Sequence, residues 1–398
     1  MDLKRKITGL IAAFAALCIP FTVCADETDE DETSVISVED SNGYITSGDF
    51  QYSLNTDDDG NQIAFLEKYT GDETKVTIPE EIDGYKVTGL GDQTFTENER
   101  ITEITISANL EKFGYYPFYG CTSLMDFKVN EDNPLYTADK EGVLVRKDGL
   151  SLIAYPIGKK PESYTVADGT ILINASAFAM CSSLKEINFP DSLKIIDYFA
   201  FSECTSLESL KLPDNVTQLG TMCFSTCTSL KSVELPENLQ ELGDAAFFKC
   251  ESLETIEFPP NLTSIGQAAF CSTGLTSITI PATITSIGYS AFGFHTDEND
   301  NFEADENFVI MGYKGSYAQT YSSENDISFV SIDEEVTEAP SSDKSKNGKI
   351  PSGTIIGFVI GLAAILVIVV VLLVLKDSSK EKGNDENENE DDDTEDTE

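Results

Sequence analysis

Residues 207–229 read LESLKLPDNVTQLGTMCFSTCTS, and the chain repeats this pattern along much of its length. Phenylalanines mark the register, because five successive ones are spaced by 23 residues and a sixth follows after 22. These are Phe178, Phe201, Phe224, Phe247, Phe270 and Phe292, and Phe95 and Phe118 form an earlier pair, again 23 apart. A fixed period of this length is the signature of stacked repeats in a solenoid.

Each unit combines a short strand with a return path. Its first half, as in Leu207–Leu212, ends in the period-two alternation of a strand with one face inward. Pro213 has no N–H to donate and ends the strand, while Gly220 is expected to permit the turn that brings the chain around. Phe224 then enters the core. One unit cannot bury its apolar face alone, so the repeat predicts a β-solenoid with short parallel strands on one side and irregular or helical turns on the other.

The unit at 207–229 resembles the bacterial surface leucine-rich repeat of the BspA-like or Treponema type. The resemblance covers about Val76 to Phe292 and implies a leucine-rich-repeat solenoid, which we place at residues 76–294. It also implies adhesion to host proteins or to other cells. Two segments depart from the repeat: residues 130–164 are predicted to insert a β-hairpin, and an acidic loop at 297–306 lies within a predicted C-terminal cap at 295–332.

Residues 46–75 are predicted to form an N-terminal capping hairpin, in which Phe50–Leu54 and Ile63–Tyr69 flank an acidic turn. That turn partly mimics a calcium loop that starts at Asn55. However, Leu66 stands where the loop needs its final Glu, so we expect a turn rather than a metal site. No metal or cofactor is predicted.

Two apolar segments predict export and membrane anchoring. Residues 1–25 have the basic start, apolar core and small-residue end of a signal peptide, with cleavage expected after Ala25. The predicted membrane helix at 353–375 contains an uncharged run from Thr354 to Leu375, long enough to cross a bilayer. The chain is therefore expected to be a single-pass protein of the cell membrane, with its N-terminal part outside.

The remaining segments are polar, and the chain as a whole carries a net charge of −44. Residues 26–45 and the predicted cytoplasmic tail at 376–398 are acidic and are expected to be disordered, while 333–352 form a linker. This charge argues against a nucleic-acid partner, which needs a basic surface. Gly353, Gly357 and Gly361 lie four residues apart and suggest weak homodimerisation through the membrane helix.

Cysteine and histidine positions give no support for an enzyme. Seven cysteines follow the signal segment, and four of them share one repeat position, which predicts a ladder of reduced thiols in the core: Cys181, Cys204, Cys227 and Cys250. The single histidine, His295, is expected in a surface loop, so no Ser-His-Asp or Cys-His arrangement is indicated.

The candidate binding residues flank the inward side chains of the predicted strands, where they face solvent. They are Glu186, Asn188, Ser209, Lys211, Ser232, Glu234, Thr255, Glu257, Ser277 and Thr279. Their polar and acidic character predicts an extracellular protein ligand with a polar or basic surface. Three alternatives stay open: a face that is merely solvated, carbohydrate capture through the cluster of Tyr115, Tyr116 and Tyr119, and a receptor that recruits a protein through its acidic tail.

Overall fold

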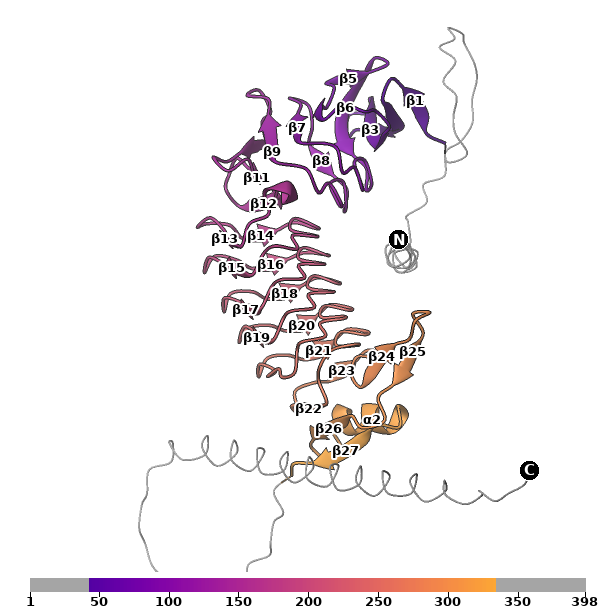
Figure 1. Cartoon of the computed structure of the whole chain (residues 1–398), viewed down its shortest axis with the longest axis vertical. Coiled ribbons are helices and arrows are strands. Elements are labelled where there is room, and N and C mark those ends of the chain that lie inside the picture. The colour runs from indigo at the N-terminus through magenta and orange to yellow at the C-terminus, as the bar shows by residue number, and fades with distance from the viewer. Residues whose placement is uncertain (1–42, 334–398) are drawn as a thin grey trace, which may run out of the picture. The chain divides into compact units, whose positions relative to one another are not determined.

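The computed structural model describes residues 43–333, which form a stack of coils (Figure 1). The fold is the predicted leucine-rich-repeat β-solenoid. Within the described range, no helix is both long and apolar enough to cross a bilayer. The predicted signal peptide, the membrane helix at 353–375 and the acidic tail lie outside the described residues, as do residues 26–42 of the acidic segment and 334–352 of the linker. The end of the segment predicted to be disordered, 26–45, is ordered, because Ile45 begins a strand.

The predicted repeat strands and two strands of the C-terminal part form one side of the stack, which we call the first face. Its strands are β4 (Lys75–Thr77), β7 (Glu103–Ile106), β9 (Asp126–Val129), β13 (Ser163–Thr165), β15 (Glu186–Asn188), β17 (Ser209–Lys211), β19 (Ser232–Glu234), β22 (Ser277–Thr279), β26 (Val309–Gly312) and β27 (Ser328–Ser331). They pair in parallel, in the groups β4-β7-β9, β13-β15, β17-β19 and β22-β26-β27. Equivalent repeat positions pair with each other, as Leu210 does with Val233.

A second parallel sheet follows the position of the repeat proline, where only irregular or helical turns were predicted. It contains β14 (Leu172–Ile173), β16 (Ile195–Ile196), β18 (Gln218–Leu219), β20 (Glu241–Leu242), β21 (Ser264–Ile265) and β23 (Ser286–Ile287). The prediction was wrong here because two-residue strands are too short to show an alternating pattern.

The turns that follow the strands of the second sheet place non-glycine residues in the left-handed region of backbone conformation. Met222 (φ 54°), Ala245 (52°) and Ala268 (52°) occupy one repeat position. This conformation costs an L-residue roughly 1–2 kcal/mol. Hydrogen bonds between coils offset the cost, since Met222 N–H donates to the carbonyl of Asp244 (2.8 Å) and Ala245 N–H to that of Gln267 (2.7 Å).

The repeat glycines serve a different purpose from the predicted turn. Gly220, Gly243, Gly266 and Gly288 do not have positive φ. Instead, a Cβ atom at Gly243 would lie 2.6 Å from the carbonyl carbon of Gly220 in the preceding coil. The position requires glycine because neighbouring backbones approach too closely for a side chain.

Two ladders of side chains fill the core. The rings of Phe178, Phe201, Phe224, Phe247, Phe270 and Phe292 stack with centroids 4.9–5.6 Å apart. Each fully buried ring contributes roughly 1.5–3 kcal/mol. All seven cysteines of the described range are buried free thiols, and they include the four members of the predicted ladder. Cys204, Cys227 and Cys250 each donate a hydrogen bond to a phenylalanine carbonyl of the preceding coil, at 3.2–3.3 Å.

The N-terminal part is a mixed sheet in the order β1-β2-β3-β6-β5, with β8 paired to β6. Its strands are β1 (Ile45–Ser47), β2 (Phe50–Thr56), β3 (Gln62–Tyr69), β5 (Glu81–Ile82), β6 (Tyr85–Leu90) and β8 (Lys112–Phe113). The antiparallel pair β2–β3 is the hairpin expected around the acidic turn, and β3 continues in parallel to β6. In that turn Asp57 accepts the N–H groups of Asp59 and Asn61.

The insertion at 130–164 contains β10 (Tyr136–Ala138), β11 (Leu144–Arg146), β12 (Ser151–Ala154) and the 3₁₀ turn η1 (Ile157–Lys159). Strands β11 and β12 form an antiparallel hairpin with Gly149 at φ 74° in its turn. Strand β12 then pairs in parallel with β14, so the insertion joins the second sheet.

The C-terminal part covers the last coil. It contains β24 (Phe294–Thr296), β25 (Phe302–Ala304) and α2 (Tyr317–Glu324) together with β26 and β27. The expected acidic loop is a hairpin, because β24 and β25 pair antiparallel around it. Tyr321 of α2 packs its ring edge-on against Phe292 and its hydroxyl hydrogen-bonds the backbone of Phe292 at 3.1 Å, so this part closes the end of the phenylalanine ladder.

Candidate binding surface

The first face presents its polar side chains outward in a regular pattern. In β15, β17 and β19 the central residue is buried and its two neighbours are exposed. Nine of the ten predicted residues are exposed, and Ser277 is partly buried. Thr255 and Glu257 lie in a coil whose first-face segment has no assigned strand. The structure thus brings the predicted residues onto one side, with an interruption in the pairing at that coil.

Strand pairing arranges these side chains in rows across the coils. Ser209 pairs with Ser232, and Lys211 pairs with Glu234. Neighbouring coils are ~4.8 Å apart at the strands. Along the central row the hydroxyl residues Ser209, Ser232 and Thr255 occupy equivalent positions. A row of small hydroxyl side chains therefore lies between longer charged ones.

Ion pairs link adjacent coils on both flanks of the hydroxyl row. Lys211 Nζ lies 2.8 Å from Glu234 Oε2, and this carboxylate raises the pKa of Lys211. On the other flank Lys231 Nζ lies 3.4 Å from Glu208 Oε2. A third pair joins Lys185 and Glu162 at 3.3 Å, at the same repeat position as the second. These pairs partly neutralise the predicted acidic character of the face.

The sequence reasoning missed this second charged row. The signal was present, because Glu208, Lys231 and Glu254 recur at one repeat position with alternating sign. These residues precede the alternating strand pattern by one position, so they were not counted among the strand residues. All three are exposed.

Comparison with known proteins decides the family. The sequence pattern described as a BspA type leucine rich repeat region, in 6 copies, matches residues 63–138 and 171–297. The chain belongs to the BspA-type leucine-rich repeat family. The stretch between the two matched segments lies largely in the insertion, where the repeat is interrupted.

This BspA-type chain is also similar to several solved structures. A leucine-rich cell surface protein from Faecalibacterium prausnitzii is 23% identical, with a TM-score of 0.32, and the match covers 70% of this chain and 66% of that one. A leucine-rich repeat protein from Bacteroides ovatus is 21% identical, with a TM-score of 0.36, and the match covers 72% of this chain and 67% of that one. The pneumococcal vaccine antigen PcpA is 17% identical, with a TM-score of 0.35, and the match covers 73% of this chain and 98% of that one. The chain spans about two thirds of the first two proteins, and a search of curated protein sequences found no match.

The single histidine of this BspA-type chain lies in strand β24 rather than in a loop. His295 Nδ1 is 2.7 Å from Asp305 Oδ1, and Nε2 is 3.5 Å from Glu303 Oε2. Nearby, Lys249 Nζ contacts Asp300 Oδ1 at 3.1 Å and so links the β24–β25 hairpin to the repeats. These contacts are consistent with a role in holding the hairpin in place.

Between residues 43 and 333, no three His, Cys, Asp or Glu side chains lie close enough together to bind a metal ion. At the calcium-like turn, the Asp57 carboxylate is occupied by N–H donors from Asp59 and Asn61. Hydrogen bonds from Asn61 are the main cause that lowers the pKa of Asp57.

The tyrosine cluster is only partly available to a ligand. The Tyr116 ring packs edge-on against Phe199 with centroids 5.0 Å apart. The Tyr119 hydroxyl donates a hydrogen bond to Glu203, and burial raises the pKa of Tyr119 well above its ordinary value. Tyr115 is 51% exposed and meets Tyr198, edge to face, at 5.9 Å. The cluster therefore offers one open ring, not an extended aromatic platform.

Proposed function

We propose that this protein is a membrane-anchored cell-surface interaction protein whose first face binds an extracellular protein. The observation that carries the proposal is the register of the first face, which repeats exposed hydroxyl and charged side chains from coil to coil. The core side chains are committed to stacking, so the outward residues are free to meet a partner. Adhesion to host or neighbouring cells is the role that the family resemblance implies.

The partner should present polar and basic groups to the first face. Glu186, Glu234 and Glu257 are exposed there, and Glu208 and Glu254 extend the acidic surface along one flank. In the same coils the lysines are fewer: Lys185, Lys211 and Lys231. Basic groups of the partner would take the place of these lysines in the ion pairs with the glutamates. Such contacts give steering and specificity and weaken as salt is added.

Anchoring and topology rest on the sequence. We propose a signal peptide at 1–25, a membrane helix at 353–375 and an acidic cytoplasmic tail at 376–398, as the sequence predicts. The repeats would then face the exterior of the cell. Weak homodimerisation through Gly353, Gly357 and Gly361 is part of the same proposal.

Charge reversal on the first face tests the proposed function. In a pull-down with the full-length protein, the variant Glu234→Lys/Glu257→Lys should bind the captured protein partner at least about tenfold more weakly, because like charges at an interface oppose association. The matched control is Glu237→Lys/Glu241→Lys, which makes the same charge change at exposed positions on the second sheet or just before it.

The control variant should bind normally and both variants should keep the wild-type circular dichroism spectrum. If the two double variants bind equally well, the first face does not carry the binding. If a glycan array retains the protein and no protein partner is captured, carbohydrate capture replaces protein binding as the function.

A further inference from the structure

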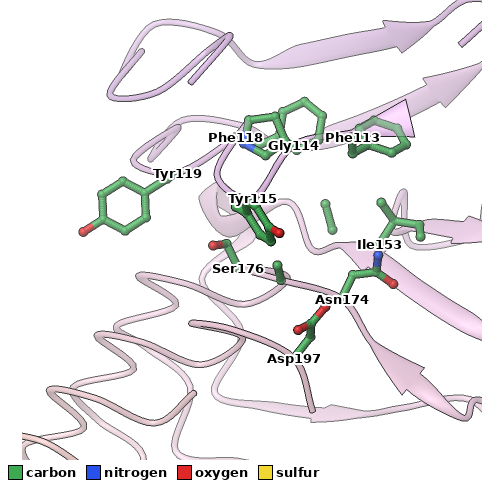
Figure 2. Close-up of a pocket in the computed structure, with 12 residues that line it drawn as sticks. Phe113, Gly114, Tyr115, Phe118, Tyr119, Ile153, Asn174, Ser176 and Asp197 are labelled. Atoms are coloured by element: carbon green, nitrogen blue, oxygen red, sulfur yellow. The ribbon is translucent and has the colours of Figure 1, made fainter. Parts of the chain in front are cut away.

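A recess of about 110 Å³ opens beside the insertion, away from the first face. Tyr115 borders it on one side, and Asn174, Ser176 and Asp197 border it on the other (Figure 2). Phe113, Ile153 and Ala154 supply apolar surface. Aromatic, apolar and polar groups thus converge at one place, as is usual in small-molecule sites.

Two of the polar residues that line the recess break the repeat. Asn174 and Asp197 occupy the position that is glycine in the four later coils. In those coils a Cβ atom would collide with the preceding backbone, at 2.4–2.7 Å. Only the first two coils after the insertion carry a side chain here, and both side chains line the recess. The two coils after the insertion that lack the repeat glycine are therefore the ones that contribute side chains to the recess at this position.

Two polar atoms of these side chains lack a hydrogen-bond partner within the protein. Among the described residues, Asn174 Oδ1 and Ser176 Oγ are buried and have no hydrogen-bond partner. Burial raises the pKa of Asp197, although its carboxylate accepts the N–H of Tyr198 at 2.8 Å. A buried polar atom without a partner costs roughly 1–3 kcal/mol. If the side chains rotate to turn these atoms toward the recess, a ligand that donates hydrogen bonds recovers this cost.

The aromatic side of the recess is accessible. Tyr115 and Tyr198 are 51% and 40% exposed, and their rings meet edge to face. Tyr115, Ala175 and Tyr198 fall at the same position, three residues before Phe118, Phe178 and Phe201, respectively. Tyr115 is the more exposed of the two, so about half of its surface is open to a ligand.

We propose that this recess binds a single neutral sugar ring, with one face of the ring on Tyr115 and its hydroxyl groups on Asn174, Ser176 and Asp197. The C–H groups on one face of a sugar carry partial positive charge and suit the negative face of an aromatic ring. Adjacent hydroxyls donate to the acceptor oxygens of Asn174 and Asp197. The site is separate from the protein-binding first face and does not depend on it.

The size of the recess limits the ligand. At 10–15 Å³ for each water-sized group, the volume accommodates about eight such groups, which corresponds to most of one sugar ring. A stacked polymer would need further open rings, and Tyr116 and Tyr119 are engaged elsewhere. The recess therefore fits a terminal or single sugar unit.

Ligand-detected saturation-transfer NMR tests this site with the full-length protein. The probes are the methyl glycosides of glucose, galactose, mannose and N-acetylglucosamine at ~10 mM, a concentration suited to millimolar affinity. At least one should receive saturation, mainly at the C–H groups of one ring face. Asp197→Gly and Tyr115→Ala should each weaken binding at least about tenfold.

The matched control is Tyr289→Ala, which removes a 60% exposed tyrosine at the same repeat position in a distant coil and should leave binding unchanged. Asp197→Gly should fold normally, because glycine occupies this position in later coils. The proposal is wrong if none of the four glycosides receives saturation, or if Asp197→Gly binds as the wild type does. It is also wrong if choline binds the recess and the glycosides do not, since the ligand would then be a cation.

Discussion

Lys211 Nζ lies 2.8 Å from Glu234 Oε2, so an ion pair joins two neighbouring coils on the first face. Both side chains are largely exposed, at 80% and 68%. Water and salt screen such a pair, and exposed pairs contribute little to folding stability. The pair is therefore better placed to meet a partner than to hold the coils together.

Removing this pair should leave the fold intact. The variant Lys211→Gln should unfold thermally at nearly the same temperature as the wild type, as measured by circular dichroism. The buried neighbour Leu210 provides the contrast, because Leu210→Ala removes a core side chain and should cost about 2–5 kcal/mol. A large loss of stability in Lys211→Gln would mean that the coils depend on the ion pair.

Substitution of a repeat glycine should be much more damaging. In Gly243→Ala the new Cβ would lie 2.6 Å from backbone atoms of Gly220, so the coils must move apart. We expect a loss of at least ~2 kcal/mol in the free energy of unfolding, measured with denaturant. Gly315→Ala is the control, since its Cβ would have open space and only backbone strain at φ 75°. Equal effects of the two substitutions would show that close approach of the coils is not the reason for glycine.

These glycines show where sequence reasoning succeeded and where it failed. The exposure of Ser232 and Glu234 could be predicted, because alternation around a buried Val233 decides which side chains point outward. Gly220 was correctly placed in the repeat but given the wrong reason, since the distance between coils is not visible in one unit. The two-residue strands of the second sheet, such as β20, were missed because their pattern is too short.

The recess could not be predicted for a different reason. Tyr115 was noticed as part of an aromatic cluster, whereas Asp197 was not singled out in the sequence. Their coils lie on either side of the insertion in sequence, and that both line one cavity is visible only in the structure. The thiol hydrogen bond from Cys227 to the carbonyl of Phe201 was also invisible, although the buried position of Cys227 was predicted.

The thiols should be inert in the folded protein and reactive after unfolding. Burial raises the pKa of Cys227 to about 12, so almost no thiolate is present at neutral pH. Iodoacetamide should label few cysteines in the native protein and all seven core cysteines in denaturant without reductant, as counted by mass spectrometry. Mass shifts that show intact disulfides in the denatured, unreduced chain would contradict the thiol ladder.

The β24–β25 turn should open in acid. Hydrogen bonds from Asn301 are the main cause that lowers the pKa of Asp297, which accepts the N–H groups of Asn299 and Asn301 at 2.7 and 2.8 Å. A lowered pKa means that the ionised form stabilises the turn. This contribution is present above the unfolded pKa and is lost as pH falls through the folded one.

Amide exchange at Asn301, corrected for its intrinsic pH dependence, should therefore lose protection below pH ~4. Asp297→Asn keeps an acceptor oxygen but cannot titrate, so its protection should not change over this range. Protection that falls equally in both proteins would assign the acid effect to other groups.

Site-specific photo-crosslinking tests the central claim, that the first face binds the partner. A benzophenone amino acid would replace Ser232, which is exposed in the middle of the first face, or Gln240, which is exposed beside the second sheet. With the captured partner present, irradiation should cross-link it through position 232 and not through position 240. Cross-linking through position 240 alone would contradict the account and place the partner on the opposite sheet.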